Sequence, residues 1–380
     1  MEWLRQELKR LEFEGLYRQR ILRDGLKDFC SNDYLALRDH PQVLEESALV
    51  LRSSGLGSGA SPLVSGYTLH HKRLEEKLAE FKGLPRCLLF GSGYMANLGA
   101  LQALAGEGDV LFSDELNHAS IVDACRLSRA KTFVFRHLDY LHLQELLSLH
   151  RKDYRRCLIV SDTLFSMEGD VAHVPTLKRL CEEYDCMLYL DEAHATGVLG
   201  AEGRGGLEAF GESWQEYIVL MGTLSKAIGS YGAFVCGSQE LCEYLVNKAR
   251  SLIFSTALPP AVCAGATKAV ELIQRESWRV QKLREVSWQI CQGLKDAGLE
   301  VSCTGTPIIP LMVYQEKRAV RIREWLLEQG ILLQAIRYPA VPKGRARLRV
   351  TASLRYSRED MSLLVETLKS LPSHLRKNVV

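Results

Sequence analysis

An acid and a lysine follow two short apolar runs of the sequence. Asp191 ends the run from Met187 to Leu190, and Lys226 follows Thr223 after a second run. Runs of this length and composition predict buried parallel strands, whose carboxyl ends open on a ligand crevice. A carboxylate there can keep a pyridine nitrogen protonated, and a lysine amine can carry the ring as a Schiff base. Asp191 and Lys226 together predict a pyridoxal phosphate site.

Each of these two features also has an ordinary explanation. A carboxylate at a strand end commonly caps a helix, and a lone Ser-Lys pair usually lies on a solvated surface. The pattern continues on both sides, however, with Thr196-Gly197 after the acid and Ala227-Ile228-Gly229 after the lysine. This continuation favours the cofactor site.

Two loops rich in small residues are candidates for contact with a ligand. The segment Phe90 to Asn97 lies between a predicted strand and a predicted helix, so backbone amides near Gly93 and Tyr94 could bind an anion at the helix N-terminus. It matches neither the dinucleotide fingerprint nor the nucleotide P-loop. The second loop, Gly55 to Pro62, is either a connector or a segment that closely approaches a ligand.

Two histidines and a serine could contact a pyridine ring. His118 follows a predicted strand, where a histidine usually caps a helix, yet a flat imidazole could also lie against the ring. His194, three residues beyond Asp191, could reach the ring's phenolic oxygen. Ser166 could donate to the same oxygen or be an ordinary turn serine. Neither HExxH spacing nor a Cys/His cluster occurs, so we expect no metal.

The composition is that of a globular protein of moderate size. The 380 residues are 47% hydrophobic and 25% charged, and the net charge of +2 gives no reason to expect nucleic-acid binding. Eleven cysteines are scattered without a CxxC pair, and most lie in apolar runs, so we expect free thiols and a reducing cytoplasm. A charged N-terminus and the absence of long apolar runs predict neither secretion nor a membrane span.

The pattern of apolar residues predicts an α/β fold. Leu4, Leu8 and Leu11 indicate an amphipathic helix that needs a partner surface, and Pro41 begins a second helix. Helical patterns then alternate with short apolar runs, as in a mainly parallel sheet. The expected strands are Cys87 to Phe90, Asp109 to Phe112, Thr132 to Phe135, Cys157 to Val160, Met187 to Leu190, Ile218 to Met221 and Ala233 to Cys236.

The last third of the chain predicts a smaller α+β domain. A helix is expected from Pro259-Pro260 to about residue 295, followed by strands near Ile308 to Val313, Ile331 to Ile336 and Arg347 to Thr351. We therefore predict an N-terminal segment over 1–45, a large cofactor-binding α/β domain over 46–265 and a C-terminal α+β domain over 266–380.

Six motifs in order make the sequence similar to the α-oxoamine synthase family. They are Ser31-Asn32-Asp33-Tyr34-Leu35, the Gly-Ser-Gly loop leading to Val64-Ser65-Gly66-Tyr67, Asn117-His118-Ala119-Ser120, Phe165-Ser166-Met167-Glu168-Gly169-Asp170, Asp191-Glu192-Ala193-His194 and Thr223-Leu224-Ser225-Lys226. The resemblance implies a fold type I pyridoxal phosphate enzyme, a homodimer with active sites at the subunit interface. It also implies condensation of a small amino acid with an acyl-CoA, with loss of carbon dioxide.

The resemblance also implies roles for individual residues. Lys226 would hold the cofactor and then remove the α-proton of the amino acid, Asp191 would pair with the ring nitrogen, and His118 would stack on the ring. Further implied contacts are His194 and Ser166 to the phenolic oxygen, and Thr223, the backbone near Gly93 and Tyr94, and Thr256 of the partner subunit to the phosphate. Arg349 and Arg18 would bind the amino-acid carboxylate and the acyl substrate, and Asn32 would also contact substrate.

Features outside the six motifs bear on the choice of substrate. Leu16-Tyr17-Arg18 and Val341-Pro342-Lys343-Gly344 resemble the family member that joins L-alanine to a pimeloyl group, carried by CoA or a carrier protein. The member that uses glycine and acetyl-CoA is the main alternative, followed by the members that make 5-aminolevulinate and sphingoid bases. An aminotransferase is a more distant one, because such enzymes more often have Tyr in the place of His194. An inactive cofactor-binding partner subunit would be expected to lack Lys226 or Asp191.

Overall fold

The computed structural model describes residues 1–376, which form two compact units. The larger unit comprises residues 35–165 and 171–281, and the smaller unit comprises residues 1–34, 166–170 and the chain from Lys282 onward. These units divide the chain at other positions than the three predicted domains do, because the N-terminal segment groups with the C-terminal region. The domain assignment remains a prediction about regions that fold separately.

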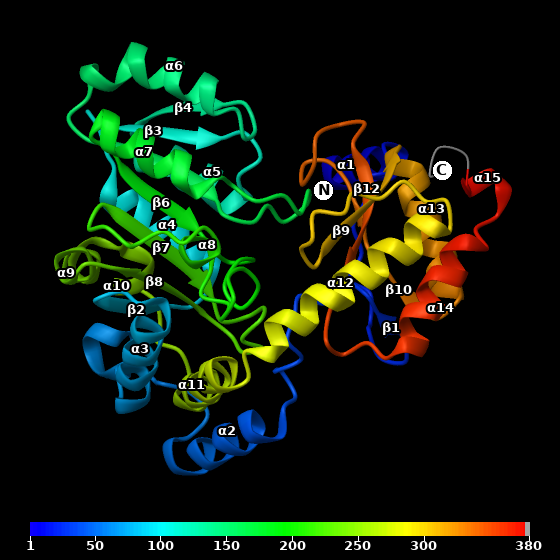
Figure 1. Cartoon of the computed structure of the whole chain (residues 1–380), viewed down its shortest axis with the longest axis horizontal. Helices are drawn as coiled ribbons and strands as arrows, with labels where there is room; N and C mark the ends of the chain where they lie inside the picture. Colours follow the sequence, from blue (N-terminus) through cyan, green and yellow to red (C-terminus); the bar gives the residue numbers. More distant parts are fainter. Residues whose placement is uncertain (377–380) are drawn as a thin grey trace. The chain divides into compact units, whose positions relative to one another are not determined.

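A seven-stranded sheet forms the centre of the larger unit (Figure 1). Its strands lie in the order β2, β8, β7, β6, β5, β3, β4. The strands from β7 to β4 pair in parallel, and β8 runs antiparallel to both of its neighbours. The bounds are β2 Arg86–Phe90, β3 Val110–Asp114, β4 Lys131–Phe135, β5 Cys157–Asp162, β6 Met187–Asp191, β7 Ile218–Thr223 and β8 Ala233–Gly237. The predicted mainly parallel sheet is confirmed.

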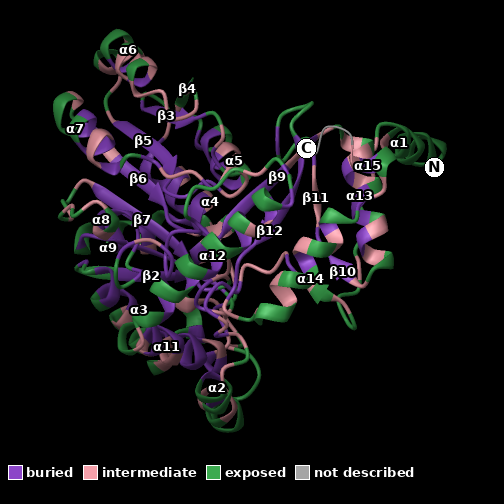
Figure 2. Ribbon diagram, turned by 45° about the vertical axis from the view of Figure 1, so that its right-hand side comes forward, coloured by how far each residue is buried: buried purple, intermediate pink, exposed green. Residues whose placement is uncertain are grey.

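Helices bury this sheet, which explains its nearly continuous apolar strands (Figure 2). Side chains of α4, α5, α9 and α10 join residues such as Val160, Tyr189 and Val219 in one hydrophobic cluster. The helices of this unit are α2 Pro41–Ser54, α3 Leu69–Lys82, α4 Gly93–Leu104, α5 Ala119–Ser128, α6 Tyr140–His150, α7 Val174–Tyr184, α8 Gly206–Ala209, α9 Gln239–Lys248, α10 Arg250–Ile253 and α11 Pro260–Arg275. A π-helical turn, η1 Pro62–Gly66, and a 3-10 turn, η2 Arg151–Asp153, complete it.

The smaller unit contains a three-stranded antiparallel sheet and a short parallel pair. Strand β12 lies between β11 and β9, and β1 pairs with β10. The strands are β1 Lys27–Asp28, β9 Ile308–Tyr314, β10 Ile331–Leu332, β11 Ala335–Ile336 and β12 Ala346–Thr351. The helices are α1 Glu2–Phe13, α13 Glu316–Glu328, α14 Arg358–Lys369 and α15 Ser373–Arg376, while α12 Trp278–Asp296 begins in the larger unit.

Two predicted elements of the C-terminal third are each divided in the structure. The single helix expected after Pro259 is two helices, because α11 ends at Arg275 and α12 begins at Trp278. Apolar periodicity continues on both sides of this break, so the pattern does not reveal it. The strand expected from Ile331 to Ile336 is the pair of short strands β10 and β11.

The cysteines differ from the expectation at one pair. Nine are free, and eight of these are buried, as expected for thiols in apolar runs. Cys291 and Cys303, however, form a disulfide in the smaller unit. Their spacing of 12 residues matches no motif, which is why the sequence did not predict the bond.

The N-terminal helix α1 is confirmed, and none of its residues is buried in the chain. Among residues 1–376, no helix combines the length and apolar character that a membrane-spanning segment requires.

Candidate active site

Polar residues end four neighbouring strands of the larger unit's sheet. Asp114, Asp162, Asp191 and Thr223 are the last residues of β3, β5, β6 and β7. Because these strands are parallel, their ends lie along one edge of the sheet, where α/β proteins bind ligands.

A cavity of about 190 Å³ opens at this edge. Its lining brings together most of the residues predicted for the larger unit: Gly93, Tyr94, His118, Asp191, His194, Thr223 and Lys226. It also contains residues that the sequence did not single out: Asn97, Ser120, Asp162, Ala193, Met221 and Ser225.

Asp191 is buried and held by hydrogen bonds on both of its carboxylate oxygens. The backbone N–H of Ala193 donates to Oδ1 at 2.8 Å, and Nδ2 of Asn97 donates to Oδ2 at 2.8 Å. Each carboxylate oxygen can accept a further hydrogen bond. The acid is therefore fixed in place and can still accept from a ligand's protonated nitrogen.

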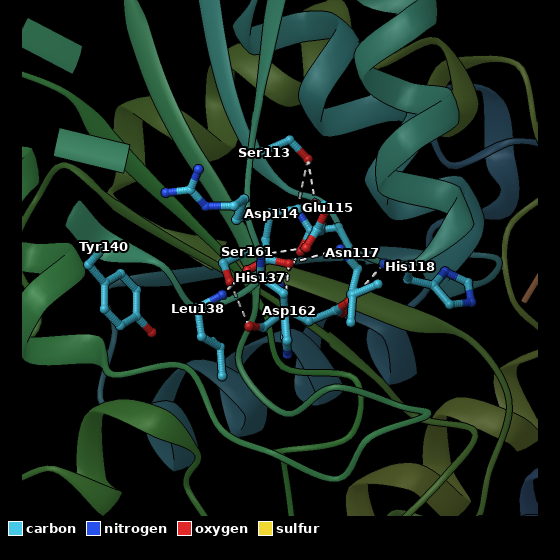
Figure 3. Close-up of polar contacts among 12 residues, drawn as sticks. Ser113, Asp114, Glu115, Asn117, His118, His137, Leu138, Tyr140, Ser161 and Asp162 are labelled. Carbon is cyan, nitrogen blue, oxygen red and sulfur yellow. Dashed lines mark hydrogen bonds and ion pairs between the residues drawn. The ribbon is translucent and has the colours of Figure 1, made fainter. Parts of the chain in front are cut away.

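His118 caps the N-terminus of α5 and is anchored by its backbone to a second acid. Its N–H donates to Oδ2 of Asp162 at 2.7 Å (Figure 3). Its Nδ1 lies 2.7 Å from Oγ of Ser120. Burial lowers the pKa of His118, the charge of Asp191 opposes this shift, and the charge of Lys226 adds to it. The imidazole is therefore neutral at pH 7.

Asp162 is a site residue that the sequence analysis missed. It is the register partner of Asp191 on the neighbouring strand, and it lines the same cavity. Burial, with Asp191 nearby, raises the pKa of Asp162 well above its usual range. The sequence holds a signal for this residue, since Asp162 follows the apolar run Cys157 to Val160 with only Ser161 between them.

The loop that carries Lys226 is built around a glycine. The N–H of Gly229 donates to the carbonyl of Lys226 at 2.8 Å, and Gly229 has a φ of +71°. A Cβ added at Gly229 would lie 2.4 Å from the backbone nitrogen of Arg38. Only glycine satisfies both the positive φ and the close approach.

A buried ion pair supports the turn that follows Asp191. The Nζ atom of Lys82, the last residue of α3, donates to Oε2 of Glu192 and to the carbonyl of Arg204. The N–H of Gly206 donates to Oε1 of Glu192 at 2.7 Å. The turn from Asp191 to His194 is thereby fixed to α3 and to the loop before α8.

The phosphate contacts predicted for this region differ in how they are placed. Gly93 and Tyr94 begin α4, where the first N–H groups of a helix have no partner within the helix and favour an anion. The hydroxyl of Thr223 donates to the carbonyl of Gly232 at 2.9 Å, so it braces the lysine loop in this structure. Thr256 lies outside this cavity and lines a separate one of about 200 Å³ with mainly apolar walls.

The remaining predicted site residues belong to the smaller unit. Arg349 donates to Oδ1 of Asn32 at 3.0 Å, and Arg18 donates to the carbonyl of Tyr338 at 3.0 Å. Ser166 opens the short segment 166–170 of the same unit. Their roles toward cofactor and substrate remain predictions.

The donor set of the cavity fits pyridoxal phosphate. It offers a buried carboxylate for the ring nitrogen, an amine for the aldehyde, a neutral imidazole for the ring face and a helix N-terminus for the phosphate. Each part of pyridoxal phosphate that carries charge or forms hydrogen bonds therefore has a complementary group in the cavity.

Known proteins resemble this chain over almost its whole length. A putative 8-amino-7-oxononanoate synthase of Aquifex aeolicus is 59% identical over 98% of this chain and 99% of its own length. The 8-amino-7-oxononanoate synthase of Cellvibrio japonicus is 46% identical over 90% of this chain and 85% of its own length.

Solved structures agree with these sequence relatives. Serine palmitoyltransferase from S. paucimobilis, with a bound PLP–myriocin aldimine, superposes with a TM-score of 0.91 at 26% identity, covering 99% of this chain and 97% of that one. The 8-amino-7-oxononanoate synthase of Francisella tularensis gives a TM-score of 0.76 at 28% identity, covering 91% and 98%. The family described as aminotransferase class I and II matches residues 25–368. The chain therefore belongs to the class I and II aminotransferase family and, within it, to the pyridoxal phosphate-dependent α-oxoamine synthases.

Proposed function

We propose that this enzyme condenses L-alanine with pimeloyl-CoA, or a pimeloyl-carrier protein, to give 8-amino-7-oxononanoate, carbon dioxide and the free thiol carrier, in biotin biosynthesis. The names of its relatives support this choice of substrates. The observation that carries the chemistry is the presence of Asp191, His118 and Lys226 in the lining of one cavity.

Bound pyridoxal phosphate supplies an electron-accepting ring that stabilises negative charge at the α-carbon of the amino acid. The residues of the chain prepare the site for that chemistry. The carboxylate of Asp191 keeps a proton on the ring nitrogen, and the neutral imidazole of His118 packs against the ring without adding positive charge. His194 and Ser166 are proposed to donate to the phenolic oxygen.

Lys226 is proposed to have two roles. Its Nζ atom would hold the cofactor, and the same amine would take the α-proton of the amino acid and later return a proton to the product. Lys226 lies near enough to His118 and Asp162 for its charge to shift the pKa of both groups. Such a lysine serves as a proton carrier inside the cavity.

Substrate contacts are proposed for residues of the smaller unit. Arg349 is largely buried, and the buried Nε of its guanidinium has no hydrogen-bond partner in the structure. A buried donor of this kind costs free energy unless a ligand accepts from it, which supports a carboxylate-binding role. Asn32 holds the same guanidinium in position, and Arg18 is proposed to bind the acyl substrate.

We propose that the functional form is a homodimer with shared active sites. Exposed apolar side chains near the second small-residue loop support this, since Leu56, Leu63 and Val64 are 81%, 52% and 79% exposed. In the dimer, Thr256 would reach the phosphate bound by the partner subunit. We place the enzyme in the cytoplasm, because nine of its eleven cysteines are free thiols, which suit a reducing compartment, and only Cys291 and Cys303 are paired.

A substrate matrix tests the proposal. Purified enzyme is incubated with L-alanine, glycine or L-serine against acetyl-, succinyl-, pimeloyl- and palmitoyl-CoA, and released CoA is measured. We expect turnover with L-alanine and pimeloyl-CoA, and none in the Lys226→Ala variant. Turnover restricted to glycine and acetyl-CoA would overturn the assigned substrates and leave the reaction class intact.

A further inference from the structure

A single buried amide connects two of the side chains that the proposed function places on the cofactor. Asn97 of α4 is fully buried and lines the cavity. Its Nδ2 donates to Oδ2 of Asp191 at 2.8 Å and to Oγ of Ser120 at 2.8 Å. Its Oδ1 accepts from the hydroxyl of Tyr189 at 2.8 Å. Both amide protons and the amide oxygen are therefore used.

The direction of each hydrogen bond follows from the groups at the ends of this network. Burial, with Asp191 nearby, raises the pKa of Tyr189 well above its usual range, so its hydroxyl keeps a proton to donate. An ionised carboxylate only accepts. The amide oxygen of Asn97 must therefore face Tyr189, and its NH₂ group must face Asp191.

The orientation of the Asn97 amide also determines how Ser120 bonds to His118. Because Oγ of Ser120 accepts from Asn97, its own proton is available for Nδ1 of His118, 2.7 Å away. The backbone N–H of Ser120 also donates to that nitrogen, at 3.2 Å. A neutral imidazole held in this way carries its proton on Nε2.

Asn97 also lies one helical turn after the residue that begins α4. Gly93 and Asn97 are four positions apart in the sequence, so they lie on the same face of the helix. The helix that presents its N-terminal amides to the cavity thus also holds the acid of β6 and, through Ser120, the histidine of α5.

We propose that Asn97 is a positioning residue, whose two amide donors align the ring-pairing carboxylate of Asp191 and, through Ser120, the ring-stacking imidazole of His118. This inference rests on the proposed function, because it concerns the same cofactor site. It predicts that donor capacity at position 97 matters, and that filling the space alone does not suffice.

Two substitutions of Asn97 separate these possibilities. Asn97→Ala removes both donors, and we expect the dissociation constant for pyridoxal phosphate to rise roughly ten- to hundredfold, as for loss of a hydrogen bond to a charged group. Asn97→Asp keeps the size and the bond from Tyr189 but presents an acceptor to Asp191, so its loss should exceed that of Asn97→Ala. A second readout is the nitrogen NMR signal of ring-labelled cofactor, which should show a less protonated ring nitrogen in both variants.

A double-mutant cycle tests the link to His118. Ser120→Ala interrupts only the path to the histidine and should weaken binding less than Asn97→Ala does. If Asn97 acts through Ser120, the two losses are not additive, because part of the Asn97→Ala effect disappears in the Ser120→Ala background.

A milder variant covers the case in which these substitutions prevent folding. Tyr189→Phe removes one hydroxyl and releases the amide oxygen of Asn97, so cofactor binding should weaken severalfold. Tyr217→Phe is the matched control, because the Tyr217 hydroxyl bonds Glu182 outside the cavity. It should bind the cofactor as wild type does.

The outcomes distinguish this inference from the proposed function. Cofactor affinity within twofold of wild type in Asn97→Asp, or tighter binding by Asn97→Asp than by Asn97→Ala, would overturn the positioning role while the wild type still binds cofactor and turns over. A wild-type protein that binds no pyridoxal phosphate would overturn the proposed function itself.

Discussion

Replacing Lys82 with methionine should destabilise the protein by about 3–5 kcal/mol, the cost of leaving one charge of a buried pair without its partner. The side chains of Lys82 and Glu192 are 0% and 1% exposed, so water cannot replace the lost ammonium group. The Glu192 carboxylate would keep the N–H of Gly206 but lose its only partner of opposite charge among the described contacts.

Urea unfolding of the cofactor-free protein, followed by circular dichroism, measures this change. Lys77→Met is a suitable control, because Lys77 makes its ion pair with Glu80 at the surface, where such pairs contribute less than about 1 kcal/mol. The double variant Lys82→Met/Glu192→Gln removes both charges and should regain about half of the loss or more. A loss below about 1 kcal/mol in Lys82→Met, or a double variant no more stable than the single one, would refute the unpaired-charge argument.

Three further predictions concern the cofactor lysine, a buried acid and the disulfide. Lys226→Ala should abolish turnover and the yellow colour of the reconstituted enzyme, measured by CoA release and by absorbance; residual turnover near the wild-type rate would contradict its role. Burial raises the pKa of Glu75 from 4.5 to about 7, so the folded state loses stability as pH rises between these values, and Glu75→Gln should melt a few degrees higher than wild type at pH 8 but not at pH 4. Glu76→Gln, at a solvated neighbouring position, should show no such pH dependence. Cys291→Ser should lower stability by about 3 kcal/mol, because it opens a loop closed by the bond to Cys303, and a reducing agent should have the same effect on wild type and none on the variant.

Much of the larger unit could be predicted from sequence because its strands are buried on both faces. All seven predicted strands are present, since runs such as Leu188 to Leu190 have no amphipathic competitor at that length. Asp191 and Lys226 could be proposed as neighbours for the same reason, because the carboxyl ends of parallel strands share one edge.

Residues that act through side-chain hydrogen bonds could not be predicted in this way. Asn97 looks like an ordinary polar residue in a helix, and its value depends on Tyr189, Asp191 and Ser120, which are distant in sequence. The structural role of Lys82 could not be predicted either, because its partner Glu192 is 110 residues away in the sequence. Sequence spacing carries no information about such pairings.

The smaller unit was harder to predict because strand pairing between distant parts of the sequence decides which segments belong to it. Strand β1 near the N-terminus pairs with β10, some three hundred residues later, and this groups the two ends of the chain. A boundary drawn along the sequence at residue 45 cannot express that grouping. The break between α11 and α12 after Arg275 could not be predicted for a local reason, because neither Gly nor Pro occurs there.

Gly229 makes the stretch after the lysine intolerant of genetic change. Any other residue at position 229 would place its Cβ too close to the backbone of Arg38. Its backbone would also have to adopt a positive φ, which is unfavourable for residues other than glycine. A library with all twenty amino acids at position 229, selected for growth without added biotin in a strain that depends on this enzyme, should return glycine alone. Substitutions accepted in this protein should therefore leave Gly229, which shapes the loop of Lys226, unchanged.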